Sequence, residues 1–540
     1  MAKIHGGRII ARALKNEGVD AVFTLTGGHI VPILDGCVEE GIRVVDVRHE
    51  QAAGHAAEAY TRLTGRLGVA AVTAGPGVTD AITAVATAHH SSTPMLLLAG
   101  RHMLRQDLRG GLQEMDHPRL FGSITKWAGT AIQLDRFAQY IATASRHAFS
   151  GRGGPVFLDV PMDLQFDMID EDAVDWPSRS RPDRASGLAQ GDLSEVAALL
   201  EVAERPVVFA SAWSWGTQNR LAALVEALHA PVFVNGKARG SLPHGHPLLG
   251  VHTRSRAFGE CDLVLALGVD WDFRTGYGAK VAAEAKVIQI DADPAKIGWN
   301  RPADVGIVAD PMAVVDQLVA LLERSDRHRP WTAEIMDQER SLAGAFAESA
   351  ATDDIPIVPH RFGLEVGDFF GEDSIVAVDG GDIVSTTARF LQVSHPGHVL
   401  DAGAFGTLGV GAPYAIAAKV AFPDKKVGIV YGDGAFGFNG FEYDTMVRLG
   451  LPAIGVIGND GVWANVKTVH KMFFPDRVVA ADLGVRPYEQ VVRGLGGFGE
   501  FVTDPGEIRP ALERAEASGL PALVNVHIAE TSRMSSNYAG

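Results

Sequence analysis

An apolar run in the last third of the chain ends on a glycine turn that carries one carboxylate. Residues 427–431 predict a strand, and Asp433 follows it between two glycines in the turn 432–434. A second apolar run ends at Asn459, 26 residues later, which leaves room for the helix and strand of a βαβ unit. Mg²⁺ prefers hard oxygen ligands in an octahedron and takes few protein donors. Asp433, Asn459 and a backbone carbonyl near Gly461 therefore predict a magnesium site that grips a diphosphate.

The same glycines permit a second interpretation. Gly432, Gly434 and Gly437 have the spacing of a dinucleotide-binding fingerprint that follows a strand. Residues 494–499 repeat this spacing in a chain with 61 glycines, so the pattern alone is weakly diagnostic. A carboxylate in such a loop would lie among phosphates with no metal to neutralise it. The sequence therefore favours the metal site, and a nucleotide-dependent oxidoreductase remains an alternative.

A carboxylate near the amino terminus has the character of a proton-transfer group. The strand-like run 44–48 ends in His49 and Glu50, and a helix rich in small residues follows from Gln51. A glutamate between a strand end and a tightly packed helix is expected to be partly buried. Burial raises a carboxylate pKa and suits the group to proton exchange with a weak base. The alternative is an exposed glutamate in the first turn of a helix, where the helix dipole favours it.

Three other polar groupings are candidates for contact with a ligand. Residues 73–77 form a glycine turn after a strand, which is either a ligand approach site or a plain βα turn. Gln113 and Glu114 follow a Gly-Gly loop, and loops carry function more often than cores do. Arg254 and Arg256 could clasp an anionic group, because guanidinium pairs with phosphate in bidentate geometry, or they could belong to a solvated surface.

The composition is that of a globular protein and argues against several classes. The 540 residues are 46% hydrophobic and 21% charged, and the net charge of −17 argues against a nucleic-acid-binding surface. The two cysteines, Cys37 and Cys261, are too few for a disulfide framework and fit a reducing cytosol. The chain shows neither a secretory pattern at its start nor a run near the roughly 18 apolar residues of a membrane span. We therefore expect a cytoplasmic protein without membrane or nucleic-acid partners.

Apolar strands alternate with helical patterns in three parts of the chain. A Pro-, Ser- and Arg-rich seam at 175–187 and a polar stretch from about 325 to 359 separate these parts. Continuous apolar runs bounded by Gly and Pro are typical of strands buried on both faces, which indicates parallel α/β sheets. We expect domains at residues 1–174, 188–325 and 358–540, the last ending in a flexible tail.

Taken in order, these segments resemble the thiamine diphosphate enzymes of the acetolactate synthase and 2-hydroxyacyl-CoA lyase group. The resemblance runs over essentially the whole chain and is carried by Arg48-His-Glu-Gln51, Thr73-Ala-Gly-Pro-Gly77, Gln113-Glu114, Gly236-Lys237, Gly432-Asp-Gly434 and Asn459. One residue departs from the pattern, because Gly458 stands where the family usually has the first of two asparagines. The metal ligand is normally the second, so the metal site is retained.

Several segments are similar to one branch of this group. Residues 254–258, 400–411 and 435–442 look like those of 2-hydroxyacyl-CoA lyases and oxalyl-CoA decarboxylases, and residues 488–491 like those of the lyases in particular. Gln113-Glu114 also matches the lyases, whereas the decarboxylases carry Tyr-Glu there. The resemblance implies a lyase that cleaves the C1–C2 bond of a 2-hydroxyacyl-CoA to formyl-CoA and an aldehyde or ketone. The alternatives are an acetolactate synthase-like carboligase, an oxalyl-CoA decarboxylase and a non-catalytic relative.

The resemblance also implies an architecture and a cofactor site. It implies three doubly wound parallel-sheet α/β domains, which bind the pyrimidine, form the centre and bind the diphosphate in that order. Thiamine diphosphate and Mg²⁺ would lie between the first domain of one subunit and the third of another, in a homodimer or homotetramer.

Individual roles follow from the family by position. Glu50 would hydrogen-bond the pyrimidine, Leu408 would bend the cofactor, and Gln113, Glu114 and Tyr488 would assist proton steps. Arg254 and Arg256 would bind the acyl-CoA substrate. Further cofactor contacts are implied at Gly28, Gly75, Gly381, Asp382, Gly406, Gly434 and Ala435, beside the metal ligands Asp433, Asn459 and Gly461.

Overall fold

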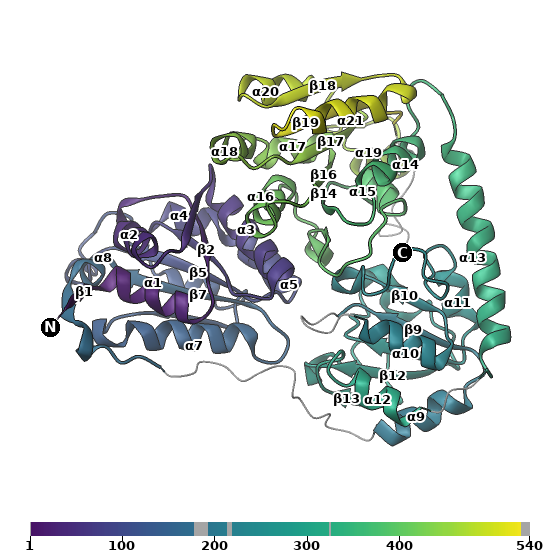
Figure 1. Cartoon of the computed structure of the whole chain (residues 1–540), viewed down its shortest axis with the longest axis horizontal. Helices are drawn as coiled ribbons and strands as arrows, with labels where there is room; N and C mark the ends of the chain where they lie inside the picture. Colours follow the sequence, from purple (N-terminus) through teal and green to yellow (C-terminus); the bar gives the residue numbers. More distant parts are fainter. Residues whose placement is uncertain (1, 178–192, 213–218, 323–325, 531–540) are drawn as a thin grey trace.

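Three parallel sheets, each covered by helices, make up the protein (Figure 1). The computed structural model describes residues 2–177, 193–212, 219–322 and 326–530. The predicted flexible tail at 531–540 and most of the first seam lie outside the described residues. The first domain lies on the left of Figure 1, the central domain at the lower right and the third domain at the top. This arrangement confirms the predicted fold class.

The first domain is built on a six-stranded sheet in which every neighbouring pair is parallel. A short antiparallel pair lies beside it, formed by β1 (Lys3–His5) and β8 (Met168–Asp170). The sheet has the order β3-β2-β4-β5-β7-β6, with β2 at Ala21–Thr24, β3 at Arg43–Asp46, β4 at Gly68–Val72, β5 at Met95–Arg101, β6 at Trp127–Thr130 and β7 at Pro155–Pro161.

The third domain repeats this strand order. Its parallel sheet runs β15-β14-β16-β17-β19-β18, so that in both domains the order along the sheet is second, first, third, fourth, sixth and fifth strand. The strands are β14 at Ile375–Asp379, β15 at Val399–Leu400, β16 at Val427–Gly432, β17 at Ile454–Asn459, β18 at Phe498–Val502 and β19 at Ala522–His527. Ligands bind at the carboxyl ends of such strands, where the predicted carboxylate and amide lie.

The central domain holds a five-stranded parallel sheet in the order β10-β9-β11-β12-β13. Its strands are β9 at Pro206–Ala210, β10 at Val232–Val234, β11 at Leu263–Leu267, β12 at Lys286–Asp291 and β13 at Val305–Val308. Its helices are α9 at Leu193–Val202, α10 at Arg220–Leu228, α11 at Arg254–Glu260 and α12 at Val315–Leu321.

Helices cover the sheets of the two outer domains (Figure 1). In the first domain they are α1 at Gly6–Asn16, α2 at Val31–Glu39, α3 at Glu50–Thr64, α4 at Pro76–Asp80, α5 at Ile82–His90, α6 at His117–Phe121, α7 at Phe137–Phe149 and α8 at Met162–Phe166. In the third they are α14 at Pro359–Phe370, α15 at Asp382–Thr387, α16 at Gly411–Ala421, α17 at Asp433–Asn439, α18 at Glu442–Leu449, α19 at Ala464–Phe473, α20 at Tyr488–Gly494 and α21 at Ile508–Ala517.

The polar stretch between the second and third domains contains the long helix α13 (Arg329–Ala350). It runs along the right edge of the molecule in Figure 1 and packs onto the central domain. The indole Nε1 of Trp331 donates to the Pro206 carbonyl at 3.1 Å, and Glu339 accepts from the backbone N–H groups of His252 and Thr253. The sequence marked this stretch only as a seam, whereas it forms a helix fixed to the domain before it.

Helices α3 and α16 join the first domain to the third. Both are rich in alanine, and the alanines of α3 and α16 lie in one buried cluster that spans the two domains. Small side chains let two helix backbones approach closely. The fully buried Glu58 of α3 accepts a hydrogen bond from the Tyr414 hydroxyl of α16 at 2.8 Å. The two halves of the predicted cofactor site therefore belong to domains that share a core.

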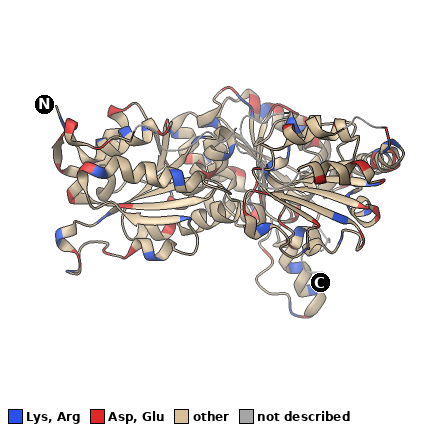
Figure 2. Cartoon of the chain, turned by 90° about the horizontal axis from the view of Figure 1, so that it is seen from below, with Lys and Arg blue, Asp and Glu red and all other residues tan. Residues whose placement is uncertain are grey.

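Charged residues of both signs are interspersed along all three domains in the view of Figure 2. Across the described ranges, we find no helix that combines the length and apolar character needed to cross a bilayer.

Candidate functional site

A cavity of about 500 Å³ opens at the carboxyl ends of β14, β16 and β17. The predicted diphosphate contacts line it, namely Gly381, Asp382, Asp433, Gly434 and Ala435, together with Asp460, Trp463 and Asn465. The glycine turn ends β16 and the amide ends β17, and these two strands are hydrogen-bonded neighbours. The fold of the third domain thus places Asp433 and Asn459 at the ends of adjacent strands, although helical residues separate them in the sequence.

Asp433 and Asn459 both present a buried oxygen without a hydrogen-bond partner. Asp433 Oδ1 accepts from the Gly434 N–H at 2.8 Å, and its Oδ2 is buried and unpartnered among the described residues. Asn459 donates through Nδ2 to the Arg486 carbonyl and to Asn525 Oδ1, which leaves Oδ1 buried and unpartnered. Burial raises the pKa of Asp433 to about 6. Such orphaned oxygens are costly unless a cation takes them as ligands.

The remaining predicted ligand, Gly461, is arranged differently. Its carbonyl accepts from the backbone N–H groups of Leu483 and Gly484 at 2.7 and 2.8 Å. Asn465, in the first turn of α19, has a buried Oδ1 without a partner among the described residues and an Nδ2 near Gly381. The sequence analysis missed Asn465; the available signal was a polar residue at the start of the helix after β17.

Gly434 is required by a neighbouring aromatic ring. A Cβ added there would lie 2.3 Å from two ring atoms of Trp463, closer than any real contact. Trp463 lines the same cavity and leads into α19. The glycine therefore sets the distance between the Asp433 turn and the start of α19.

Gly434→Ala is expected to push Trp463 aside and to weaken the binding of a diphosphate ligand by about tenfold or more, the effect of losing one charge-assisted hydrogen bond. A titration followed by tryptophan fluorescence measures this. Gly437→Ala is the matched control, because that Cβ meets nothing within 4 Å on the same helix. Equal affinities for the two variants would contradict the role given to Gly434.

Glu50 is the first residue of α3 and is 8% exposed. His49 caps the helix, with Nδ1 accepting from the Gln51 N–H at 3.1 Å. Burial raises the pKa of Glu50, and the nearby Asp80 carboxylate adds to the rise. A Cβ on Gly77 would lie 3.4 Å from Glu50 Oε1, so the carboxylate faces the glycine turn after β4. Glu50 is thus a buried residue at the start of a helix, and the exposed setting considered as the alternative does not apply.

The glycine turn after β4 also contacts Gln113. Gly75 has φ +60°, and a Cβ on it would lie 2.8 Å from the Gln113 Cβ. Gln113 itself has φ +59°, a strained conformation for a residue with a side chain and one that clusters at functional sites. Glu50, Gly75 and Gln113 therefore lie around one turn.

Two histidines, His117 and His29, make hydrogen bonds to this turn. His117 lies fully buried between Asp159, 3.0 Å from its Nδ1, and the Gly75 N–H, which donates to its Nε2 at 3.0 Å. His29, next to the predicted contact Gly28, places Nδ1 3.1 Å from Thr73 Oγ1. These side chains hold the turn in place.

Glu114 is directed toward the loop backbone. Its carboxylate accepts from the N–H groups of Leu108 and Gly111, and these hydrogen bonds lower its pKa. These two hydrogen bonds tie Glu114 to the loop segment that presents Gln113.

Leu408 lies in a loop that is fixed by a buried carboxylate. Asp379, at the end of β14, accepts from the backbone N–H groups of Gly409 and Gly411 at 3.1 and 2.8 Å. Burial raises the pKa of Asp379 to about 7. Gly406 precedes Leu408 with φ +66°. The hydrogen bonds to Asp379 therefore fix the position of Leu408.

Tyr488 begins α20 beside the diphosphate cavity. Its ring lies 5.3 Å from that of Phe436 in α17, and burial together with the Asp433 carboxylate raises its pKa. Tyr488 is therefore near the predicted metal ligand.

The two predicted substrate arginines lie in different surroundings. Arg256 is ion-paired with Glu260 at 3.0 Å and with Glu334. Arg254 makes no hydrogen bond or ion pair within the described part of the chain, and burial and the neighbouring Arg239, Arg274 and Arg389 lower its pKa. Arg254 is thus the one of the pair that is available to an anion.

Comparison with known proteins gives the family. Residues 4–120, 193–318 and 379–526 match the N-terminal TPP binding domain, the central domain and the C-terminal TPP binding domain of the thiamine pyrophosphate enzymes. A probable acetolactate synthase of Mycobacterium bovis is 40% identical, with 97% of this chain and 95% of the relative covered. The 2-hydroxyacyl-CoA lyases 2 of Homo sapiens and Caenorhabditis elegans are each 33% identical, with 98% of this chain and 90% of each relative covered. The chain therefore belongs to the thiamine pyrophosphate enzyme family, as the sequence motifs predicted.

Proposed function

We propose that the protein is a lyase that cleaves a 2-hydroxyacyl-CoA between C1 and C2, with Mg²⁺ and thiamine diphosphate as cofactors. The products are formyl-CoA and an aldehyde or ketone, and the proton of the 2-hydroxyl group ends on C1 of formyl-CoA. The observation that carries the proposal is Arg254, a half-buried guanidinium without a partner in the described part of the chain and beside three further arginines. Relatives named 2-hydroxyacyl-CoA lyase 2 support it.

Two of the neighbouring arginines are already ion-paired with carboxylates. Arg239 is ion-paired with Asp401 at 3.0 Å, and Arg274 with Asp272 at 2.7 Å. Arg254 has no such carboxylate in the described part of the chain. Since guanidinium binds phosphate in bidentate geometry, a phosphate of coenzyme A fits the place of the missing anion.

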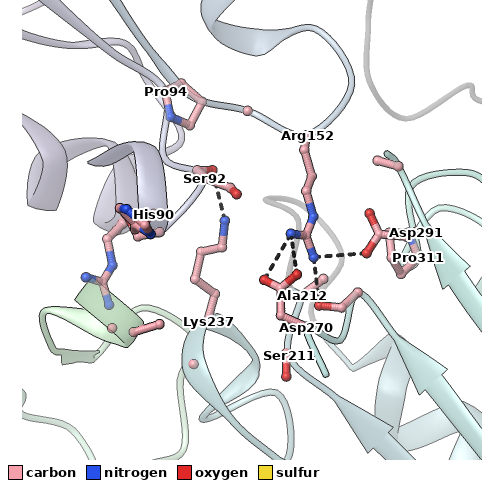
Figure 3. A pocket seen from close by; sticks show the side chains of 18 of the residues that line it. His90, Ser92, Pro94, Arg152, Ser211, Ala212, Lys237, Asp270, Asp291 and Pro311 are labelled. Carbon is pink, nitrogen blue, oxygen red and sulfur yellow. Dashed lines mark hydrogen bonds and ion pairs between the residues drawn. The ribbon is translucent and has the colours of Figure 1, made fainter. Parts of the chain in front are cut away.

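A larger cavity, of about 990 Å³, adjoins this cluster where the three domains meet (Figure 3). Arg274 lines it, as do Arg62 and Lys237, and the dashed lines in Figure 3 mark the bonds of Arg152 to Asp270 and Asp291. We place the nucleotide end of the substrate here.

The third domain would hold the cofactor by its charged end. Asp433 Oδ2 and Asn459 Oδ1 would ligate Mg²⁺, and the backbone at Gly381 and Gly434 would face the diphosphate. When bound, thiamine diphosphate supplies an acidic carbon that adds to a carbonyl group and then holds the electrons of the broken bond. The protein supplies position, proton transfer and exclusion of water.

Four residues of the chain would each have a separate role in the reaction. Glu50, buried with a raised pKa, would hold a proton for exchange with the cofactor. Leu408, in the loop fixed by Asp379, would be the bulky residue packed against the cofactor. Gln113 on the strained loop orients the 2-hydroxyl group, and Tyr488 lies where it can pass a proton near the metal site.

We further propose that two chains share each cofactor, in a homodimer or a homotetramer. Residues of the third domain line the diphosphate cavity, which opens at the Asp433 end of α17. The same chain's Gln51, next to Glu50, instead contacts Asn439 at the opposite end of α17, with 3.3 Å between Nδ2 and Oε1. A seven-residue helix is about 10 Å long, which supports a Glu50 from another copy as the partner of Asp433.

A second candidate is favoured by the relative at 40% identity. Its name is acetolactate synthase. An enzyme of that kind would join two 2-keto acids with loss of one carboxyl group as CO2, instead of cleaving an acyl-CoA. Arg254 would then bind a carboxylate.

A substrate panel separates these functions. The protein, loaded with thiamine diphosphate and Mg²⁺, is incubated with linear and branched 2-hydroxyacyl-CoAs, with oxalyl-CoA and with pyruvate, and the products are identified by mass spectrometry. Formyl-CoA formed from a 2-hydroxyacyl-CoA supports the lyase, and acetolactate formed from pyruvate in its place overturns it. Arg254→Ala is expected to raise the KM for the acyl-CoA by about tenfold or more, the effect of one charge-assisted hydrogen bond. Arg256→Ala, already ion-paired in the protein, should have the smaller effect.

A further inference from the structure

We propose that Glu442 is a positioning residue for Glu50, because its buried carboxylate reaches from the third domain to hold the turn that carries Glu50. Glu442 opens α18 and is 1% exposed. Its Oε1 and Oε2 lie 2.9 and 3.2 Å from the backbone nitrogen of Arg48, which donates to both. The inference rests on the role of Glu50 in the proposed function.

The turn from residue 47 to 49 has few other ties. It connects β3 to α3, and only its ends are fixed by the first domain itself, through the Val47 N–H to the Thr24 carbonyl and through the His49 cap. The N–H of Arg48 in between finds its acceptor in Glu442. Thr445 donates to Glu442 Oε2 at 2.6 Å and so fixes the carboxylate in turn.

The contact between Glu442 and Arg48 requires a buried carboxylate, whose ionised form is unfavourable in free energy. Burial raises the pKa of Glu442 to about 7, so the ionised carboxylate is disfavoured where it lies. Arg48, Arg448 and Thr445 oppose this rise without abolishing it. Strongly shifted carboxylates of this kind are enriched at functional sites.

Neighbouring residues hold the same segment from both sides. Arg448 donates to the Asp46 carbonyl at 2.9 Å, and Asn439 donates to Gln51 Oε1 at 3.3 Å. We call Asn439 of α17, together with Glu442 and Arg448 of α18, the α17–α18 clasp. The clasp contacts the backbone of Asp46 and Arg48 and the side chain of Gln51, and so holds the chain on both sides of Glu50. Loosening the clasp should therefore displace Glu50 while the Asp433 turn stays in place.

Glu442→Ala tests this in the full-length holoenzyme. We expect kcat to fall by at least tenfold, while the Kd for thiamine diphosphate in the presence of Mg²⁺ stays within about threefold, since charge-assisted contacts to the diphosphate are untouched. The near-ultraviolet circular dichroism of the bound cofactor should change, because its ring loses a fixed partner. Glu442→Gln keeps an acceptor for the Arg48 N–H and is expected to restore most of the turnover.

Hydrogen–deuterium exchange of the peptide containing Arg48 gives a readout that needs no substrate. Its amide should lose protection in Glu442→Ala and keep it in Glu442→Gln. Asp262→Ala is the matched control, because Asp262 also accepts two backbone N–H groups, those of Glu204 and Arg205, in the central domain. It should change neither the turnover nor the Arg48 amide.

Several results would overturn the inference. Turnover of Glu442→Ala within threefold of the unmodified enzyme would do so, as would an unchanged Arg48 amide. An equal loss of turnover and of cofactor affinity would reduce Glu442 to a general stabiliser. If the unmodified enzyme fails to cleave every 2-hydroxyacyl-CoA of the panel, the proposed function fails, whereas the amide exchange and the dichroism still judge Glu442.

Discussion

Glu50→Gln will reduce thiamine diphosphate-dependent turnover by about 10²–10⁴-fold, the range contributed by a positioned general acid or base. Glutamine has the shape of Glu50 but cannot hold or release the proton. The glutamine side chain is uncharged, and burial disfavours a charge at this position. We therefore expect the variant to retain the fold. Turnover is measured by product formation, and folding by circular dichroism and the melting temperature.

Asp35→Asn provides the control for that experiment. Asp35 lies on α2 of the same domain and its side chain is 66% exposed, so its replacement removes a charge without touching the glycine turn. Turnover close to that of the unmodified enzyme is expected. If Glu50→Gln also retained turnover, the assignment of the proton-exchange group would be wrong.

Asp433→Asn will have opposite effects on the cofactor-free and the cofactor-bound protein. The folded-state pKa of about 6 lies above the usual 3.8, so the native state binds this proton more tightly than the unfolded chain. The stabilisation is complete below pH 3.8 and is lost as the pH rises through 6. At pH 8 the ionised carboxylate therefore costs about 3 kcal/mol, since each pKa unit corresponds to about 1.4 kcal/mol. Asparagine removes this cost but also removes the anionic ligand.

Thermal melting at pH 8 with and without thiamine diphosphate and Mg²⁺ measures both effects. Without them the variant should melt higher than the unmodified protein. With them its melting temperature should rise much less, because the stabilisation by a ligand grows with the logarithm of its concentration divided by its Kd. An equal gain in the two proteins would contradict the assignment of Asp433 to the metal.

Mixing the two inactive variants tests whether the site is shared. In a random mixture of Glu50→Gln and Asp433→Asn chains, half of the dimers contain one chain of each kind. Each such dimer has one site with both residues intact, so about one quarter of all sites should be active if the interface follows two-fold symmetry. No recovery after mixing would argue that each chain holds its own cofactor.

The sequence predicted the groups that lie at strand ends and missed those defined by packing. Asp433 directly follows β16, Asn459 ends β17, and Glu50 follows the short turn after β3. The carboxyl ends of parallel strands form ligand sites. Trp463, Asn465 and Glu442 act through neighbours in space. The contact between Glu442 and Arg48, for example, joins residues 394 positions apart in the sequence. No local periodicity carries such information.

Residue type alone does not give the direction of a polar group in a loop. Glu114 and Gly461 were predicted as site residues, and in the structure the Glu114 carboxylate and the Gly461 carbonyl each accept two backbone N–H groups. A carboxylate or carbonyl in a loop can satisfy its own backbone as readily as a ligand. The sequence cannot distinguish the two outcomes, because they differ only in the path of the loop.

The first and third domains share one strand order. Two six-stranded sheets of the same order present different loops at equivalent places. The loop after the third strand carries the carboxylate Asp433 in the third domain, and the equivalent loop of the first domain is the glycine turn at Gly75. Exchange of these loops between the two scaffolds is therefore a feasible way to engineer new sites in this protein.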